Sequence, residues 1–124
     1  MTTEKAKQVV LVVDDEPAIR LLCRVNLELG GYEVREAGSL GEARSCLDQG
    51  VDVVLLDMHI GNERGETLLD ELVEREIPVA VVTGSTDVEA IAATSANAVL
   101  GKPFTIEELE STVARLAALR AARL

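Results

Sequence analysis

The 124-residue sequence is poor in aromatic residues, with no tryptophan, one tyrosine and one phenylalanine. Aliphatic side chains and alanine must therefore fill the core, and a hydrophobic content of 48% is enough for one. Basic residues are also scarce, because 12 lysines and arginines face 22 acidic residues, for a formal net charge of −10. We therefore do not expect nucleic acid or an anionic membrane surface as a direct partner, since the acidic protein would repel their phosphates.

Cysteine is rare, and the spacing of Cys23 and Cys46 suits neither a metal site nor a disulfide framework. Both lie in amphipathic patterns, so we expect small buried hydrophobic side chains in a reduced, cytoplasmic compartment. No apolar run approaches membrane-spanning length. Residues 1–7 are polar and precede only a short apolar run, so we expect no signal peptide. The length is typical of one domain, and we expect a single domain over residues 1–124.

Five apolar segments alternate with helical patterns along the chain. Strands are predicted at residues 9–13, 32–37, 51–57, 79–83 and 98–100. Helices are predicted to begin after each of them, near residues 17, 40, 66, 88 and 106. Right-handed crossovers make such a chain a parallel sheet with helices on both faces. We therefore predict a flavodoxin-like, doubly wound α/β fold, a (βα)5 three-layer sandwich with strand order 2-1-3-4-5.

Local signals mark several helix ends. Ser39 and Thr105 each precede a glutamate by three residues, which predicts a capping box at the start of two helices. Glycines at 30–31 and 50 are expected to end the first two helices. Residues 58–65 are expected to form a loop, and the Lys102–Pro103 peptide is a candidate cis bond. The predicted inward side chains of the first and third helices are Ile19, Leu22, Cys23, Leu27, Leu68, Leu69, Leu72 and Val73.

The most informative strand is the third, because its apolar run from Val53 to Leu56 has no polar alternation. A strand of this kind is buried on both faces in the middle of a parallel sheet. Asp57 follows at its carboxyl end, which is the edge where open α/β sheets place their ligands. A carboxylate at the edge of a core is costly unless it has partners, so its neighbours indicate the function.

Other polar residues are expected at this edge because they also follow parallel strands: Asp14, Asp15, Thr83 and Lys102. Carboxylates gathered there repel one another, by roughly 4 kcal/mol per pair at ~4 Å and an effective dielectric near 20. A lysine and a divalent hard cation would offset this repulsion, and carboxylates with a carbonyl and waters suit Mg²⁺. Asp57 could then attack phosphorus and form an aspartyl phosphate, with Lys102 and Thr83 contacting the phosphoryl oxygens.

Five short motifs, each weak alone, occur here in one order and on matching elements. They cover residues 10–17, 53–57, 65, 79–84 and 102–104. Over essentially its whole length the chain thereby resembles a response-regulator receiver domain of two-component signalling. The resemblance implies that a histidine kinase or histidine phosphotransfer protein donates a phosphoryl group to Asp57.

The resemblance also implies roles for the remaining residues of the site. Asp14, Asp15 and Asp57 would hold Mg²⁺ together with the backbone carbonyl of His59. Thr83 and Lys102 would contact the phosphate. Such a domain is a self-phosphorylating and self-dephosphorylating switch rather than a turnover enzyme. Its output could be partner binding, transfer to another histidine, or homodimerisation through the face of the fourth helix, fifth strand and fifth helix.

Other functions fit the sequence less well. An aspartate-nucleophile phosphatase needs a second aspartate at position 59, where this chain has a histidine. A flavin carrier of this topology would meet acidic side chains at residues 14–16, which repel a phosphate. A non-phosphorylated docking scaffold remains the alternative, although an incomplete acidic site would be expected for it.

The sequence departs from the usual receiver pattern in three places. Ile60 and Gly61 replace the usual methionine and proline after the acceptor, and Val99 replaces the switch aromatic. The segment between Thr83 and Lys102 is also short for the family. We therefore predict that the fourth helix, residues 88–94, is the least rigid element.

Overall fold

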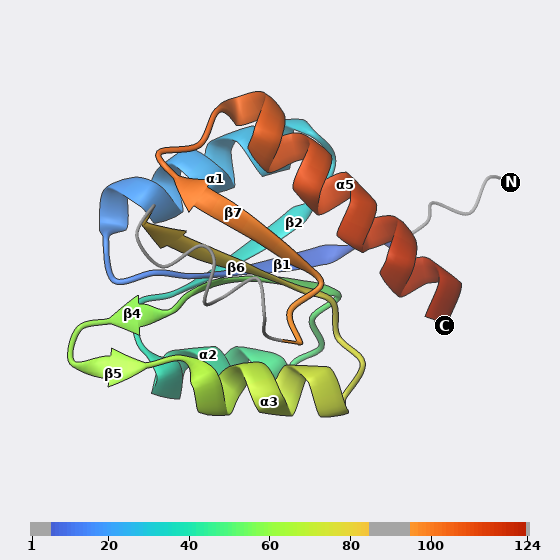
Figure 1. Cartoon of the computed structure of the whole chain (residues 1–124). Coiled ribbons are helices and arrows are strands. Elements are labelled where there is room, and N and C mark those ends of the chain that lie inside the picture. The colour runs from blue at the N-terminus through green and yellow to red at the C-terminus, as the bar shows by residue number, and fades with distance from the viewer. Residues whose placement is uncertain (1–5, 85–94, 124) are drawn as a thin grey trace, which may run out of the picture.

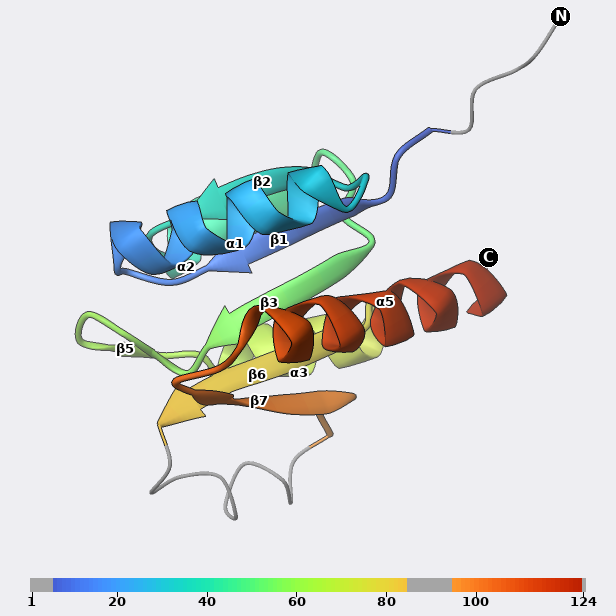
Figure 2. The same ribbon diagram turned by 90° about the horizontal axis from the view of Figure 1, so that it is seen from above.

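A sheet of five parallel strands lies at the centre of the computed structural model, which describes residues 6–84 and 95–123. The strands are β1 (Val9–Val13), β2 (Glu33–Ala37), β3 (Val53–Asp57), β6 (Val79–Gly84) and β7 (Ala98–Lys102). Their order across the sheet is β2-β1-β3-β6-β7, with β2 and β7 at the edges (Figure 2). Because β6 and β7 are the fourth and fifth strands of this sheet along the chain, the predicted order 2-1-3-4-5 is confirmed.

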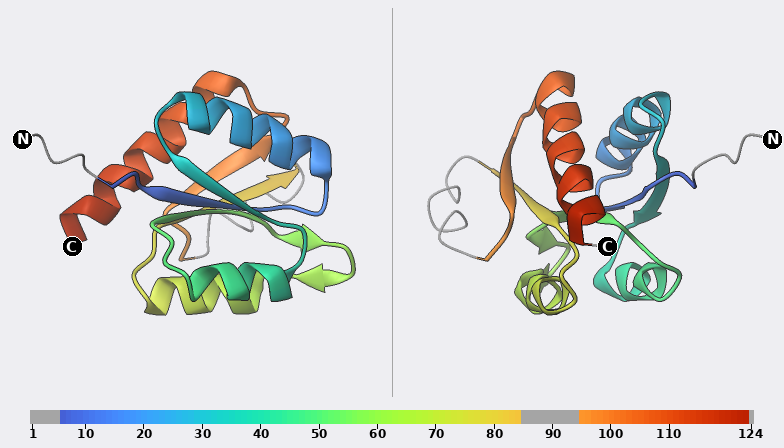
Figure 3. Two further views of the ribbon diagram at one scale, coloured as in Figure 1. Left: turned by 180° about the vertical axis from the view of Figure 1, so that it is seen from behind. Right: turned by 90° about the vertical axis from the view of Figure 1, so that its right-hand side faces the viewer.

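Helices cover both faces of this sheet and complete the layers of a doubly wound α/β fold (Figure 1). On one face lie α1 (Pro17–Leu29) and α5 (Ile106–Arg123), which contact each other. On the other lie α2 (Leu40–Leu47) and α3 (Glu66–Glu74) (Figure 3). The helix predicted at residues 88–94, and its predicted lack of rigidity, fall outside the described residues. No helix in the described part is long and apolar enough to cross a membrane.

Successive residues of a strand point to opposite faces, so the sheet separates two hydrophobic cores. All five residues of β3 are buried, as predicted for a central strand. Val54 and Leu56 pack in the core under α2 and α3, while Val53 and Leu55 pack in the core under α1 and α5. Each fully buried aliphatic side chain contributes about 1.5–3 kcal/mol, so β3 is held firmly from both sides. Asp57 therefore ends a rigid strand.

For two side chains the prediction that they point into the core is wrong. Leu22 of α1 is 39% exposed and Val73 of α3 is 38% exposed. In α1 the buried residues are Cys23 and Leu27, one helical turn apart. The helix touches the sheet along this narrow stripe, and Leu22 lies beside the stripe rather than on it. Cys23 is thus buried as predicted, whereas Cys46 in α2 is only partly buried.

The helix ends follow the local sequence, with one difference. At α5 the capping box is complete, because the Thr105 hydroxyl accepts from the Glu108 N–H and the Glu108 carboxylate accepts from the Thr105 N–H. At α2 the Ser39 hydroxyl accepts from the Glu42 N–H. The Glu42 carboxylate, however, accepts from the N–H of Gly38 at 2.7 Å instead of that of Ser39. It therefore ties the β2–α2 turn one residue earlier than predicted.

Two loops are more regular than predicted. Residues 58–65 contain a small antiparallel hairpin of β4 (His59–Ile60) and β5 (Glu63–Arg64). Strand β7 continues through Lys102, because Gly101 and Lys102 pair with the last residues of β6. The peptide bond that follows, between Lys102 and Pro103, is cis as anticipated.

Candidate functional site

The carboxyl edge of the sheet gathers the polar side chains that the sequence singled out. Asp57 is the last residue of β3, and Asp14 directly follows β1. Parallel pairing sets Asp57 beside Val82, so Thr83 lies one residue further along β6. Thr83 pairs with Gly101, which places Lys102 at the end of the neighbouring strand. The register of the strands thus brings residues far apart in sequence to one edge.

Lys102 is the cationic centre of this edge. Its Nζ lies 2.9 Å from Oδ2 of Asp14 and 3.3 Å from Oδ2 of Asp57. A third carboxylate, that of Glu16, is 3.7 Å away. Asp14 and Asp57 are only 2% and 7% exposed. One partly buried ammonium group therefore compensates two buried carboxylates, as charges removed from water require.

Asp57 is held at both carboxylate oxygens. Oδ1 accepts from the backbone N–H of His59 at 3.1 Å, and Oδ2 accepts from Lys102. Burial nevertheless raises the pKa of Asp57 above its ordinary value, and the negative charge of Asp14 raises it further. The hydrogen bonds and the charge of Lys102 oppose this rise without cancelling it. Additional positive charge beside Asp57 would therefore favour its carboxylate form.

The pKa of Lys102 is also raised, but burial acts on it in the opposite direction. Burial alone would lower the pKa of Lys102, but the hydrogen bond and charge of Asp14 and the charge of Asp57 raise it above its ordinary value. Lys102 is therefore protonated throughout the physiological range. It can neutralise an anion that arrives beside Asp57.

Asp15 lies at the same edge but on the solvent side. Its Oδ2 accepts from the N–H of Gly61 at 2.9 Å, so the β1–α1 loop is tied to the β4–β5 hairpin. Side-chain oxygens of Asp14, Asp15 and Glu16 lie within 4.8 Å of one another. An all-oxygen set of this kind suits a hard divalent cation such as Mg²⁺. Glu16 is absent from the predicted ligands, although the acidic run Asp14 to Glu16 was a visible signal for it.

The hydroxyl of Thr83 is a further polar group in this site. Thr83 is 2% exposed, and its Oγ1 has no hydrogen-bond partner among the described residues. A buried hydroxyl without a partner costs about 1–3 kcal/mol, which is a reason to ask what ligand it meets. An oxygen-rich ligand at the edge of the sheet would give this hydroxyl an acceptor.

The site residues predicted from the sequence thus lie together at one edge, but they are not all in direct contact. Asp14, Asp57 and Lys102 are in direct contact. Asp15 joins them through its neighbour Asp14 and the Gly61 backbone. His59 contributes its N–H to Asp57, while its side chain is exposed. One residue that the sequence did not single out, Arg20, reaches the backbone of Asp14, and no pattern in the sequence distinguished it from other helix arginines.

Comparison with known proteins agrees with this geometry. A family model described as response regulator receiver domain matches residues 10–114. The chain is 41% identical over 85 residues to the transcriptional regulatory protein AruR of Pseudomonas aeruginosa. This match covers 63% of this chain and 35% of that protein. It is 37% identical over 119 residues to the transcriptional regulatory protein KdpE of Mycobacterium tuberculosis, covering 91% of this chain and 50% of that protein.

Solved structures of receiver domains and response regulators are similar to this chain as well. The crystal structure of the receiver domain of NtrX from Brucella abortus matches with a TM-score of 0.81 and 29% identity, covering 88% of this chain and 98% of that one. The chemotaxis response regulator CheY4 of Vibrio cholerae matches with a TM-score of 0.79 and 28% identity, covering 90% and 99%. The chain spans half or less of the two curated relatives described above.

Proposed function

Because the chain belongs to the family of response-regulator receiver domains, whose members are phosphoacceptor switches, we propose that Asp57 is its phosphoacceptor. A histidine kinase or histidine phosphotransfer protein supplies the phosphoryl group. Asp14, Asp15, Asp57 and the His59 backbone carbonyl hold Mg²⁺. The domain acts as a switch that gains and loses its phosphoryl group, not as a turnover enzyme.

The observation that carries this proposal is the shared lysine. Lys102, at the end of β7, lies within 3.3 Å of both Asp14 and Asp57. An ordinary structural carboxylate needs one cation, whereas here a cation is shared by two buried acids. The edge therefore remains short of positive charge, which favours binding of a divalent cation. A carboxylate prepared in this way is a suitable nucleophile for phosphorus.

The transfer itself is a simple displacement. A carboxylate oxygen of Asp57 forms a bond to phosphorus while the phosphorus–nitrogen bond of the donor's phosphohistidine breaks. The leaving imidazole nitrogen takes the electron pair of that bond. Lys102 stabilises negative charge on the phosphoryl oxygens, and the Thr83 hydroxyl donates a hydrogen bond to one of them. When bound, Mg²⁺ neutralises further charge on the same oxygens.

We propose that the phosphodonor docks on the outer face of α1. The α1 outer face consists of Leu21, Leu22, Val25 and Leu29, which are 59%, 39%, 49% and 82% exposed. Leu22, Val25 and Leu29 are spaced three and four residues apart, as in a seam between packed helices.

A surface hollow of about 330 Å³ continues this face toward Asp57. Leu22 and Lys102 both line the hollow, together with Phe104. Because Lys102 also contacts Asp57, a helical donor seated on the α1 outer face would have its phosphohistidine close to the acceptor. The occupant we propose is therefore the kinase or phosphotransfer helix that carries the histidine.

Four further expectations belong to this proposal. The two free cysteines favour a reduced, cytoplasmic compartment. Burial, and to a smaller extent the charge of Asp14, raise the pKa of the Cys23 thiol to about 11. Because the thiolate is the reactive form, we expect Cys23 to be unreactive. The net charge of −10 favours protein partners over nucleic acid or an anionic membrane. Homodimerisation through the face of the fourth helix, β7 and α5 is one form that the output could take. The fourth helix, predicted at residues 88–94, lies outside the described residues.

The test is phosphoryl incorporation from acetyl phosphate, with and without Mg²⁺, in the wild type and in Asp57→Asn. We expect Mg²⁺-dependent labelling in the wild type and none in the variant. Asp70→Asn, an exposed change on α3, is the matched control and should label normally. Labelling that persists in Asp57→Asn would place the acceptor elsewhere. A wild type that binds Mg²⁺ but is labelled neither by acetyl phosphate nor by any kinase would favour the docking scaffold.

A further inference from the structure

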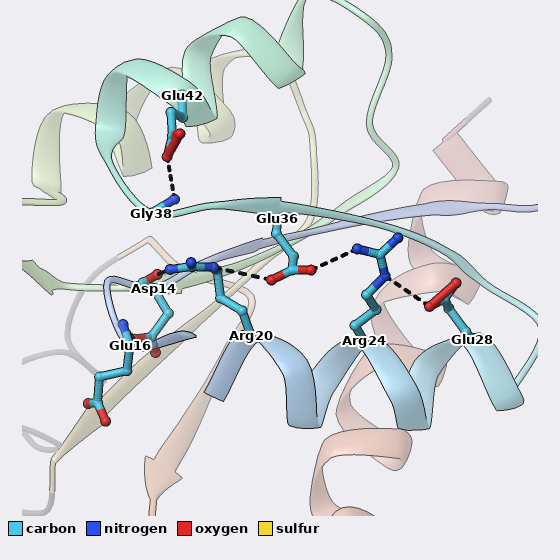
Figure 4. A network of polar contacts seen from close by, with 8 residues as sticks. All are labelled: Asp14, Glu16, Arg20, Arg24, Glu28, Glu36, Gly38 and Glu42. Atoms are coloured by element: carbon cyan, nitrogen blue, oxygen red, sulfur yellow. Dashed lines mark hydrogen bonds and ion pairs between the residues drawn. The ribbon is translucent and has the colours of Figure 1, made fainter. Parts of the chain in front are cut away.

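An arginine outside the acidic site is built into its support. The Nη1 of Arg20, in the first turns of α1, donates to the backbone carbonyl of Asp14 at 2.6 Å. Its Nε donates to Oε1 of Glu36 in β2 at 3.2 Å. Figure 4 shows the guanidinium group lying between these two partners. The Arg20 side chain is only 19% exposed, so these contacts are shielded from water.

The contact matters because Asp14 is fixed at every polar atom. Its N–H donates to the carbonyl of Ala37, and its Oδ1 accepts from the N–H of Glu16. Its Oδ2 pairs with Lys102. Arg20 holds the remaining backbone oxygen, at the peptide that joins Asp14 to Asp15. The direction of this peptide sets where both carboxylates point.

The guanidinium is itself enclosed. A Cβ atom added at Gly38 would lie 3.0 Å from Nη1 of Arg20, so the β2–α2 turn closes directly over the group. The same turn is anchored by the bond from the Gly38 N–H to the Glu42 carboxylate (Figure 4). There is therefore little room for Arg20 to adopt another rotamer while the turn is in place.

The remainder of the ion-pair network lies further from the site. Oε2 of Glu36 accepts from Nη1 of Arg24 at 2.9 Å, and Nε of Arg24 donates to Glu28 at 3.0 Å. These hydrogen bonds raise the pKa of Arg24, and the bond to Glu36 has the larger effect. Arg24 belongs to the same network and the same helix, but its hydrogen bonds go to Glu28 and Glu36 and not to Asp14 (Figure 4). It therefore offers a matched control for Arg20.

We propose that Arg20 is a positioning residue for the cation site: it orients the Asp14–Asp15 peptide so that both carboxylates are in place before a divalent cation binds. Arg20 touches neither carboxylate and is not a catalytic residue. Its planar guanidinium can bond the carbonyl and Glu36 at once, which the single ammonium of a lysine cannot reproduce in the same geometry. This inference rests on the proposed Mg²⁺ site.

The readout is the dissociation constant for Mg²⁺, measured by calorimetric titration of the unphosphorylated protein. Removing a group that orients metal ligands typically weakens metal binding on the order of tenfold to a hundredfold. We expect Arg20→Met to raise this constant about tenfold, and Arg20→Lys to raise it nearly as much although the charge is kept. Arg24→Met should leave it within about twofold, because its partners do not reach the cation ligands.

Phosphorylation kinetics provide a second readout. If Arg20 acts through cation binding, the labelling rate of Arg20→Met with acetyl phosphate should approach the wild-type rate when Mg²⁺ is raised to saturation. A merely structural arginine would lower thermal stability in Arg20→Met while leaving the dissociation constant for Mg²⁺ unchanged. That result would overturn the inference, as would an equal weakening of Mg²⁺ binding in Arg24→Met.

The outcomes separate this inference from the proposed function. A wild type that binds no Mg²⁺ would overturn the cation site and the role of Arg20 together. A wild type that binds Mg²⁺, with unaltered binding in both Arg20 variants, would overturn only the role of Arg20. If Arg20→Met does not fold, Arg20→Lys decides, since it retains the charge and most of the side-chain volume.

Discussion

Lys102→Met removes the cation that two buried carboxylates share, and its effect can be worked out from the geometry. Oδ2 of Asp14 and Oδ2 of Asp57 lie 2.9 and 3.3 Å from the lysine nitrogen. The two oxygens are therefore at most about 6 Å apart, and at an effective dielectric near 20 such charges repel by roughly 3 kcal/mol. In the wild type the two attractions to Lys102 offset this repulsion; the variant loses them, although it no longer buries an ammonium group, and the repulsion is left uncompensated.

We therefore expect the free energy of unfolding of Lys102→Met at pH 7, without divalent cations, to fall by about 3 kcal/mol. Because the chain has no tryptophan, urea unfolding is best followed by far-ultraviolet circular dichroism. Millimolar Mg²⁺ should restore part of the loss, since a cation that binds only the folded state stabilises it by an amount that grows with the logarithm of cation concentration above the dissociation constant. The double variant with Asp57→Asn should recover most of it, because only one buried carboxylate remains.

The loss must also depend on pH, with a definite sign. The pKa of Asp57 is already raised by burial, and it must rise further when Lys102 no longer opposes the rise. A carboxyl group whose pKa is higher in the folded state costs stability above that folded pKa and none below its unfolded pKa. The destabilisation should therefore be larger at pH 7 than in acid, and it should shrink as the pH falls toward the ordinary value of 3.8.

Two results would refute this reasoning. One is a loss smaller than about 1 kcal/mol at pH 7, the level of an exposed ion pair. The other is an equal loss at pH 7 and near pH 4, which would mean that lost packing of the lysine side chain, and not repulsion between carboxylates, is responsible.

Three further changes test other parts of the molecule. Leu22→Ala with Val25→Ala should slow transfer from a phosphohistidine donor but not from acetyl phosphate, whereas Val73→Ala on α3 should affect neither rate. Thr83→Val removes a buried hydroxyl and should raise the free energy of unfolding by about 1 kcal/mol in urea titrations, while shortening the lifetime or lowering the yield of the labelled state. Thr105→Ala should lower that free energy by about 1 kcal/mol through loss of the α5 cap, with unchanged labelling.

The local sequence determined most of the helices and strands of the central layers, although not the β4–β5 hairpin. Unbroken apolar runs specified β1 and β3 as buried strands, because a strand covered on both faces has no polar alternation. The threonine and glutamate at the start of α5 form the predicted reciprocal cap, since a capping box depends only on neighbouring backbone and side-chain groups. Right-handed crossovers predicted a parallel sheet with helices on both faces, and the order 2-1-3-4-5 was predicted as the common one for five-stranded sheets of this type. Asp57 could thus be assigned to the carboxyl edge of the sheet.

Tertiary structure decided how groups from different elements meet. The phase of α1 against the sheet left Leu22 exposed, because helix periodicity defines an apolar stripe but not its contact line. Pairing with β6 extended β7 to Lys102, so the lysine emerges from a strand and not from a loop. Arg20 meets its two partners only because β1 and β2 lie side by side next to α1, since these partners are 6 and 16 residues away in sequence. Contacts of this kind depend on strand register and helix packing, which no local pattern specifies.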